Sequence, residues 1–219
     1  SVNATSCGEN SYNDIILENY TITRDKIDFK LNIDKNSFST TLKGKHNLFN
    51  IMFAVAIAKK IGLTNEEIRH VIDNISKITN MRLESIPYAE DSLIINDAYN
   101  ASPTSMKAAV DVISDLNDFE FKTLVLGSMF ELGPNEVEYH SGVGTYINNN
   151  SRGINLVISV GTLAKNITDN INNKDISTLH FSTVEEVTDY LKANKHKNEV
   201  ILFKASRSMK LETIINDIK

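Results

Sequence analysis

The residues best placed to do chemistry stand directly after short apolar runs of this sequence. Asp97 follows the run Ser92-Leu93-Ile94-Ile95 by two residues and precedes Tyr99, Asn100 and Ser102. At the carboxyl end of a parallel strand, a carboxylate can accept hydrogen bonds from ribose hydroxyl groups. The alternative is a turn residue whose carboxylate binds amides of its own turn, and spacing alone favours that alternative.

A second group, Lys204-Ala205-Ser206-Arg207, follows the last apolar run of the chain. Two cations and a hydroxyl beside a helix N-terminus suit a carboxylate or a phosphate. Equally, Ser206 could simply cap the helix while both cations are solvated. A third segment, Gly127–Gly133, has a glycine at each end, which indicates close approach to a ligand or turns with positive φ. It is not a Walker loop, because the pattern Gly-x-x-x-x-Gly-Lys-Ser/Thr occurs nowhere in the chain.

Two asparagines are spaced to share one side of a helix start. Asn47 and Asn50 lie three residues apart, after Gly44-Lys45-His46. Each amide carries both donors and an acceptor, so the pair could read the edge of a purine. The alternative is that Asn47 caps the helix and Asn50 is incidental. A lone histidine such as His46 is more often structural than a ligand.

Composition narrows the classes of function. The net charge of −5 argues against binding duplex nucleic acid, which usually requires a basic excess. Cys7 is the single cysteine, so no internal disulfide can form, as is typical of a reducing cytoplasm. No apolar run approaches the roughly 18 residues of a membrane span. The five histidines lack metal-site spacing, and no Gly-x-Ser-x-Gly turn supports a serine hydrolase.

The elements that must hold these residues alternate between strand and helix in the second part of the chain. Apolar runs predict five strands, at 92–95, 123–126, 156–160, 178–181 and 200–203. Ser102 with Pro103, and a capping box at Ser182–Glu185, predict helix starts between them. This alternation is typical of an α/β fold with a Rossmann-like, doubly wound, mainly parallel sheet. Functional residues should then lie beyond the carboxyl ends of the strands.

The first part of the chain has a different pattern of apolar residues. Short β-rich runs predict antiparallel strands at 14–17, 20–22, 27–31 and 38–42. Two helices should follow, one over Asn47–Ile61 and one opened by a capping box at Thr64–Glu67. The change in texture near residues 80–86 predicts two domains, an α+β domain at 1–83 and the doubly wound sheet at 84–219.

The order of these motifs resembles the Mur ligase family. It runs Gly44-Lys45-His46-Asn47-x-x-Asn50, Arg82-Leu83-Glu84, Asp97-Ala98-Tyr99-Asn100-Ala101-Ser102-Pro103, Leu126-Gly127-Ser128-Met129-x-Glu131-Leu132-Gly133 with His140 downstream, and Lys204-Ala205-Ser206-Arg207. The pattern Tyr-Asn-Ala-x-Pro-x-Ser-Met, from Tyr99 to Met106, is similar to the branch of the family that adds D-alanyl-D-alanine to UDP-N-acetylmuramoyl-tripeptide. The resemblance implies that 1–83 is the end of a central ATP-binding domain and 84–219 a C-terminal ligase domain.

By that resemblance, the chain is part of an ATP-dependent amide ligase that requires Mg²⁺. The tripeptide carboxylate is phosphorylated, and the dipeptide amine then attacks to give an amide, ADP and phosphate. The C-terminal domain would close over the central one as a lid. The residues implied in nucleotide binding are His46, Asn47 and Asn50 at the adenine end, with Arg82 and Asp97 at the ribose and phosphates. Those implied in binding the dipeptide are Tyr99, Asn100, Glu131, Ser206 and Arg207.

Three positions depart from the family's pattern. Asn96 and Ser128 stand where relatives often have Asp, and Ala205 where they have Gly, so we expect no acid–base role at the first two. The family's phosphate loop and magnesium ligands would lie upstream, so we expect a piece of a longer cytoplasmic, monomeric enzyme that is inactive alone. Two alternatives stay open: a non-catalytic nucleotide-binding or interaction module with a Mur-like fold, or another superfamily ligase such as a folylpolyglutamate synthetase.

Overall fold

A computed structural model describes residues 4–75, 81–89 and 91–219 and divides the chain into two compact units, Ser1–Ile78 and Thr79–Lys219. The second unit takes in residues 79–83, which the change in sequence texture assigned to the first domain. Each unit has a sheet and a hydrophobic core of its own. Among the described residues, no helix is both long and apolar enough to cross a membrane.

The first unit is built on a four-stranded sheet in the order β1-β2-β3-β4. Its strands are β1 (Cys7–Gly8), β2 (Ile15–Ile22), β3 (Ile27–Leu31) and β4 (Phe38–Thr40). The last three are antiparallel, as predicted, whereas β1 pairs parallel with β2 and was not predicted. The runs predicted as separate strands at 14–17 and 20–22 form one strand, whose pairing shifts register between Leu17 and Asn19.

Two helices complete this unit, α1 (Lys45–Lys60) and α2 (Asn65–Asp73). The start of α1 lies two residues before the predicted one, because Gly44, at φ 86°, provides the N-cap. Its predicted apolar face is buried at Leu48, Ile51, Met52 and Val55. The capping box predicted for α2 is confirmed, since the Thr64 side chain accepts from the Glu67 amide and the Glu67 carboxylate accepts from the Thr64 amide.

The second unit is built on a six-stranded sheet in the order β5-β6-β10-β7-β8-β9. The strands are β5 (Glu84–Tyr88), β6 (Ser92–Asn96), β7 (Phe121–Gly127), β8 (Leu156–Val160), β9 (Ser177–Phe181) and β10 (Glu199–Lys204). The five predicted strands are present and parallel. β5 was not predicted and runs antiparallel to β6. Its Pro87 weakens the strand pattern and is tolerated because β5 is at the edge of the sheet.

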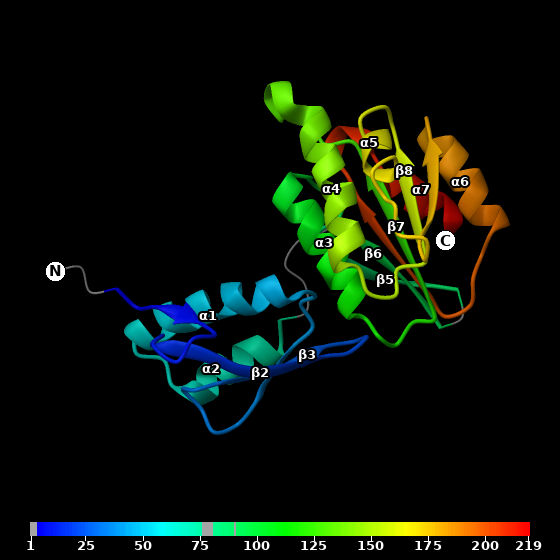
Figure 1. Cartoon of the computed structure of the whole chain (residues 1–219). Coiled ribbons are helices and arrows are strands. Elements are labelled where there is room, and N and C mark those ends of the chain that lie inside the picture. Colours follow the sequence, from blue (N-terminus) through cyan, green and yellow to red (C-terminus); the bar gives the residue numbers. More distant parts are fainter. Residues whose placement is uncertain (1–3, 76–80, 90) are drawn as a thin grey trace. The chain divides into compact units, whose positions relative to one another are not determined.

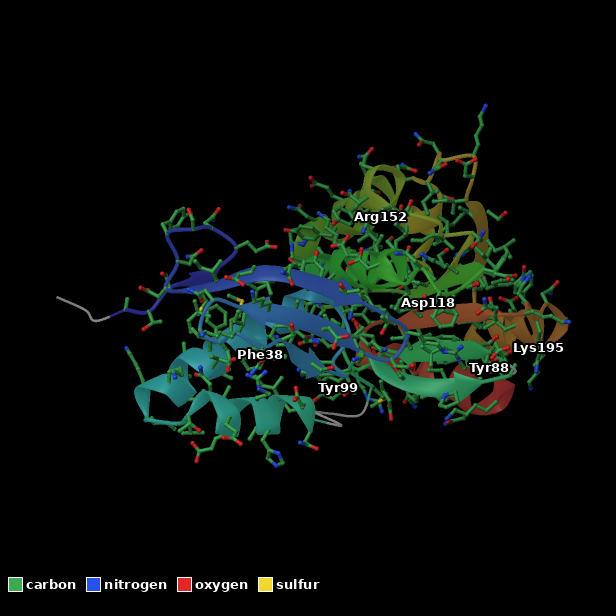
Figure 2. The ribbon with its side chains drawn as sticks, turned by 90° about the horizontal axis from the view of Figure 1, so that it is seen from below. Phe38, Tyr88, Tyr99, Asp118, Arg152 and Lys195 are labelled. Carbon is green, nitrogen blue, oxygen red and sulfur yellow. The ribbon has the colours of Figure 1, made fainter. Side chains whose placement is uncertain are left out.

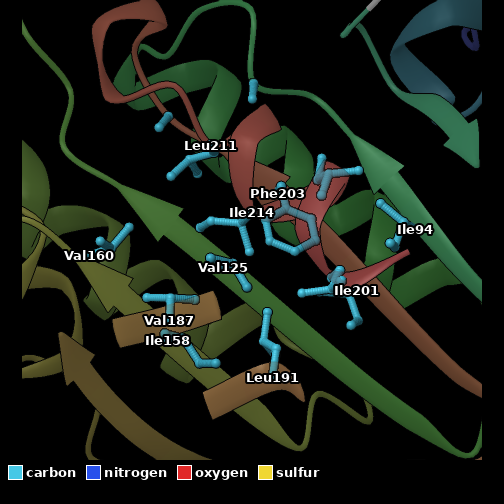
Figure 3. Close-up of a cluster of buried hydrophobic side chains, with 14 of the residues drawn as sticks. Ile94, Val125, Ile158, Val160, Val187, Leu191, Ile201, Phe203, Leu211 and Ile214 are labelled. Carbon is cyan, nitrogen blue, oxygen red and sulfur yellow. The ribbon is translucent and has the colours of Figure 1, made fainter. Parts of the chain in front are cut away.

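Helices cover both faces of this sheet (Figure 1). They are α3 (Pro103–Asp115), α4 (Glu136–Asn150), α5 (Lys165–Thr168), α6 (Val184–Ala193) and α7 (Glu212–Ile218). α3 packs against α4, and α4 against α5, while α6 and α7 pack together on the opposite face. There Val187 and Ile214 meet Val125, Ile158 and Phe203 from the strands (Figure 3). The predicted doubly wound α/β fold is therefore confirmed.

Local signals fix two of the helix starts. Ser102 and Ser105 form a reciprocal capping box at the start of α3, with Pro103 in the first turn, as Ser102 and Pro103 predict. The box predicted at Ser182–Glu185 lies one residue too early. The N-cap of α6 is Thr183, whose side chain accepts from the Glu186 amide.

The amino ends of the strands hold a buried carboxylate, Glu199, at the start of β10. Thr123 Oγ1 on β7 donates to Glu199 Oε1 over 2.6 Å, and the Glu199 amide donates to Ser92 Oγ on β6. Burial raises the pKa of Glu199. At this side of the sheet, the Lys195 ammonium lies 5.5 Å from the centroid of the Tyr88 ring (Figure 2). The hydrogen bonds of Glu199 join β10 to β7 and β6, at the opposite edge from the predicted site.

Candidate functional site at the carboxyl edge of the sheet

The segments predicted to carry chemistry meet at the carboxyl edge of the second sheet. β6, β10 and β7 are neighbours, so the residues after each of them are brought together. The Asp97 amide donates to the carbonyl of Phe203 at the end of β10 over 2.9 Å. The Ser206 amide donates to the carbonyl of Ser128, just after β7, over 3.1 Å. The three loops therefore form one hydrogen-bonded group.

Asp97 is held by a buried lysine. Lys204, the last residue of β10, donates from Nζ to Asp97 Oδ2 over 2.6 Å and to the carbonyl of Asn100 over 3.0 Å. The Asp97 Oδ1 atom accepts from the amide of Leu83, 14 residues upstream, over 3.2 Å. These partners lie outside the turn that follows β6, so the interpretation of Asp97 as a carboxylate bound to amides of its own turn is wrong.

The segment before β5 has an unusual backbone. Met81 and Leu83 have φ values of 59° and 47°, in the left-handed region that residues other than glycine seldom adopt. The Tyr99 amide donates to the carbonyl of Met81 over 3.2 Å. Arg82, between the two, is exposed, and its guanidinium lies 4.8 Å from the centroid of the Tyr99 ring. The structure thus brings the predicted residues Arg82, Asp97 and Tyr99 into one contact group.

The Gly127–Gly133 segment is tied to the end of β10. Ser206 is 7% exposed, and its Oγ accepts from the Phe130 amide over 2.9 Å. Ser206 precedes a short 3₁₀ turn (Arg207–Met209) but makes no side-chain cap, so its interpretation as a simple cap is wrong. Next to Phe130, Glu131 is exposed at φ 62°. Gly133 has φ 72°, as the interpretation of a turn with positive φ predicts, whereas the space beside Gly127 is taken by Ala205 of the same chain.

Both cations of the Lys204–Arg207 group form ion pairs, which contradicts the alternative in which both are only solvated. Lys204 is 2% exposed and paired with Asp97. Arg207 is exposed but forms an ion pair with Glu212. An anionic ligand would have to share the exposed Arg207 with the carboxylate of Glu212, because Lys204 is buried.

A buried histidine binds the backbone of the Gly127–Gly133 segment. His140, in α4, is fully buried, and its Nε2 accepts from the Met129 amide over 2.8 Å. The Nδ1 atom lies 2.6 Å from the carbonyl of Glu136, so Nδ1 carries the proton and the ring is neutral. Burial lowers the pKa of His140. His140 therefore positions the loop backbone and is not exposed to a substrate.

The three positions that depart from the family's pattern have structural partners. Asn96 Oδ1 accepts from the Ala98 amide over 3.2 Å, and Ser128 Oγ accepts from the Ala164 amide over 3.2 Å. Both side chains are buried. A β-carbon added to Gly127 would lie 2.6 Å from the Ala205 β-carbon, so the space at Gly127 is filled by Ala205.

The remaining predicted residues lie in the first unit, at the start of α1. Asn50 Nδ2 donates to Asn47 Oδ1 over 3.1 Å, so the two amides are adjacent as their spacing predicts. Asn47 Nδ2 donates to the carbonyl of Lys43 over 2.7 Å. The alternative in which Asn47 caps the helix is wrong, because the N-cap is Gly44. His46 and Asn50 are exposed.

Sequence reasoning missed the role of Lys204 and gave no role to His140. The position of Lys204 at the end of an apolar strand, in the motif that also holds Ser206, indicated a functional residue. Nothing in the sequence indicated that its partner would be Asp97, 107 residues away.

No group of three or more His, Cys, Asp and Glu side chains that could hold a metal ion occurs in residues 4–75, 81–89 and 91–219.

Comparison with known proteins identifies the chain's relatives. The sequence pattern of the family described as "Mur ligase, glutamate ligase domain" matches residues 81–207, which hold the whole carboxyl-edge group. The chain belongs to the Mur ligase family. The UDP-N-acetylmuramoyl-tripeptide–D-alanyl-D-alanine ligase of Bacillus subtilis (strain 168) is 37% identical over 99% of this chain and 48% of its own length. The ligase of the same name from Escherichia coli (strain K12) is 30% identical over 94% of the chain and 44% of its length.

Solved structures agree with this membership. A MurF crystal structure from Acinetobacter baumannii has a TM-score of 0.82 at 25% identity, covering 98% of this chain and 46% of the other. MurC from Thermotoga maritima, at 12% identity and a TM-score of 0.74, shares the fold. This Mur ligase chain spans about half the length of the curated relatives it matches.

Proposed function

We propose that this chain is part of an ATP-dependent ligase that joins D-alanyl-D-alanine to UDP-N-acetylmuramoyl-tripeptide in peptidoglycan precursor synthesis. The observation that carries the proposal is the likeness to the Bacillus subtilis ligase of that name, which extends over 99% of the chain. We assign Ser1–Ile78 to the central ATP-binding domain and Thr79–Lys219 to the C-terminal ligase domain. The enzyme would act in the cytoplasm as a monomer.

The nucleotide would be bound by two groups of residues. Asn47 and Asn50, with His46 beside them, would contact the adenine, because their adjacent amides offer donors and acceptors to a purine edge. Asp97 would accept hydrogen bonds from the ribose hydroxyls, and Arg82 would contact the phosphates. A Thermotoga maritima MurF with the same fold has been solved in complex with ADP, which supports a nucleotide as the ligand.

The dipeptide would be bound at the carboxyl edge of the second sheet. Its carboxylate suits a cation such as Arg207, and its amine suits the exposed carboxylate of Glu131. Tyr99, Asn100 and Ser206 belong to the same hydrogen-bonded loops and would shape the site. In the whole enzyme, the tripeptide carboxylate is phosphorylated, and the dipeptide amine displaces phosphate to form the amide. We assign the Mg²⁺ ligands of the proposed reaction to a part of the enzyme other than the residues described here.

Calorimetry of ADP binding to the 219-residue chain tests the nucleotide assignment. We expect Asp97→Ala to weaken binding by about tenfold, since hydrogen bonds to a charged acceptor contribute about 1.5–3 kcal/mol. Equal affinities would contradict the ribose assignment. The chain by itself should not turn over ATP with tripeptide precursor and dipeptide, and turnover would contradict our assignment of the missing activity to the rest of the enzyme.

A further inference from the structure

The two residues of the ion pair at the carboxyl edge, Lys204 and Asp97, differ in their exposure to solvent. The Lys204 side chain is 3% exposed and that of Asp97 16%. Asp97 is therefore the more accessible member of the pair, and Lys204 is almost completely buried. Lys204 nevertheless contacts two parts of the loop after β6, through Asp97 Oδ2 and the Asn100 carbonyl.

Asp97 Oδ1 connects the Lys204–Asp97 pair to residues 81–83, where Met81 and Leu83 have left-handed φ values. Leu83, whose φ is 47°, donates its amide to Asp97 Oδ1. Left-handed φ values cost free energy for residues with a β-carbon, so hydrogen bonds must hold such a backbone in place. Met81 is held in the same way, with its amide bound to Glu84 Oε2 and its carbonyl to the Tyr99 amide. Arg82 lies between these two fixed residues.

We propose that Lys204 is a positioning residue for nucleotide binding: it fixes the Asp97 carboxylate for the ribose hydroxyls and, through Asp97, fixes the backbone that carries Arg82. The inference rests on the proposed role of Asp97 in binding a nucleotide. It assigns Lys204 no contact with the ligand, because the ammonium is buried behind Asp97.

The hydrogen-bonding capacity of Asp97 is compatible with both tasks. A carboxylate has about four lone-pair positions, and the contacts with Lys204 and Leu83 occupy one on each oxygen. Ribose hydroxyls can use the positions left without displacing either partner. The protein contacts therefore orient the carboxylate before the nucleotide arrives.

The test compares two buried lysines of the same sheet. Lys204→Met removes the ammonium and keeps most of the side-chain volume. The matched control is Lys122→Met on β7, because Lys122 is also buried but donates to the carbonyls of Ser114 and Arg152 and contacts neither Asp97 nor residues 81–84. Both changes should destabilise the chain, so global stability alone does not distinguish them.

Two readouts do distinguish them, both on the 219-residue chain under conditions where circular dichroism shows folded protein. Amide hydrogen exchange of Leu83 should become about tenfold faster in Lys204→Met and stay unchanged in Lys122→Met, since exchange reports local opening. ADP affinity, by calorimetry, should fall about tenfold in Lys204→Met, because the ribose hydroxyls would then meet a charged acceptor that is no longer oriented. The control should bind ADP as the wild type does.

The outcomes separate the two proposals. Unchanged Leu83 exchange in Lys204→Met overturns the positioning role. Faster exchange with unchanged ADP affinity also overturns it, provided that Asp97→Ala weakens binding. If Asp97→Ala binds ADP as tightly as the wild type, the nucleotide assignment itself fails, whatever Leu83 exchange shows. Should Lys204→Met not fold, Lys204→Gln, which keeps a donor for the Asn100 carbonyl, is subjected to the same comparison.

Discussion

His140 accepts a hydrogen bond at Nε2 from the backbone amide of Met129, and through it α4 holds the loop that follows β7. Both residues are fully buried, so the Met129 amide has no access to solvent as a substitute partner. A buried amide without a partner costs about 1–3 kcal/mol. The contact therefore gives His140 a structural role in shaping the loop that carries Phe130 and Glu131.

The stability lost on replacing His140 should depend on whether the new side chain can accept a hydrogen bond from the Met129 amide. We expect His140→Leu to lower the free energy of unfolding by about 1–3 kcal/mol, because the Met129 amide loses its acceptor. His140→Gln can place an amide oxygen near the position of Nε2 and should lose less. Urea denaturation measures both. Equal stability of His140→Leu and the wild type would show that the hydrogen bond contributes nothing.

The same residue should make stability depend on pH. Burial lowers the pKa of His140, so the unfolded chain binds this proton more tightly than the folded one. The stabilisation is complete above the ordinary histidine pKa of about 6.5 and is lost as the pH falls through the folded pKa. Between about pH 7 and pH 5, the free energy of unfolding should fall more steeply for the wild type than for His140→Gln. Parallel curves would exclude His140 as the source.

Glu199 should make stability depend on pH with the opposite sign. Burial raises its pKa, so its contribution to stability is complete below the ordinary carboxyl value and is lost as the pH rises through the folded pKa. Glu199→Gln keeps an acceptor for Thr123 Oγ1 and removes the charge. We expect the variant to be more stable than the wild type at pH 7, because it keeps the acceptor and removes a buried charge. The difference should shrink toward pH 4.

The control for Glu199 is Thr123→Val, which removes the donor and leaves the buried carboxylate with one partner fewer. It should lower stability at pH 7, where Glu199→Gln raises it. Chemical denaturation at pH 7 and pH 4 measures all three proteins. A loss of stability in Glu199→Gln at pH 7 would mean that the charge is compensated by contacts stronger than those seen.

Gly127 and Ala205 should behave as a coupled pair. An added β-carbon at Gly127 would lie 2.6 Å from that of Ala205, closer than real contacts allow. Gly127→Ala should therefore cost about 1–3 kcal/mol, the usual penalty for overpacking. The double variant Gly127→Ala/Ala205→Gly moves the methyl group from one strand end to the other and should recover most of that loss.

A double-mutant cycle by urea denaturation measures the coupling between the two positions. Ala205→Gly alone serves as the control, because it opens space and relieves no clash. Additive effects in the double variant would show that the Gly127 penalty does not come from the contact with Ala205.

Much of the fold could be predicted because its signals are local. An apolar run of five residues, a Ser before a Pro, or a Thr three residues before a Glu acts over one or two turns of chain. These signals gave the five parallel strands and the starts of α2 and α3. The error of one residue at α6 arose because Ser182 and Thr183 are both good caps, and it is the Thr183 side chain that accepts the hydrogen bond from the Glu186 amide.

By itself, the sequence determined that Asp97, Ser128 and Ser206 follow strands of a doubly wound sheet and so lie at its carboxyl edge. The tertiary structure alone decided which of them meet. β10 inserts between β6 and β7, and this order places Lys204 beside Asp97 and Ser206 beside Phe130. Strand order depends on packing between segments about a hundred residues apart, and no local pattern of side chains encodes a partner at that distance.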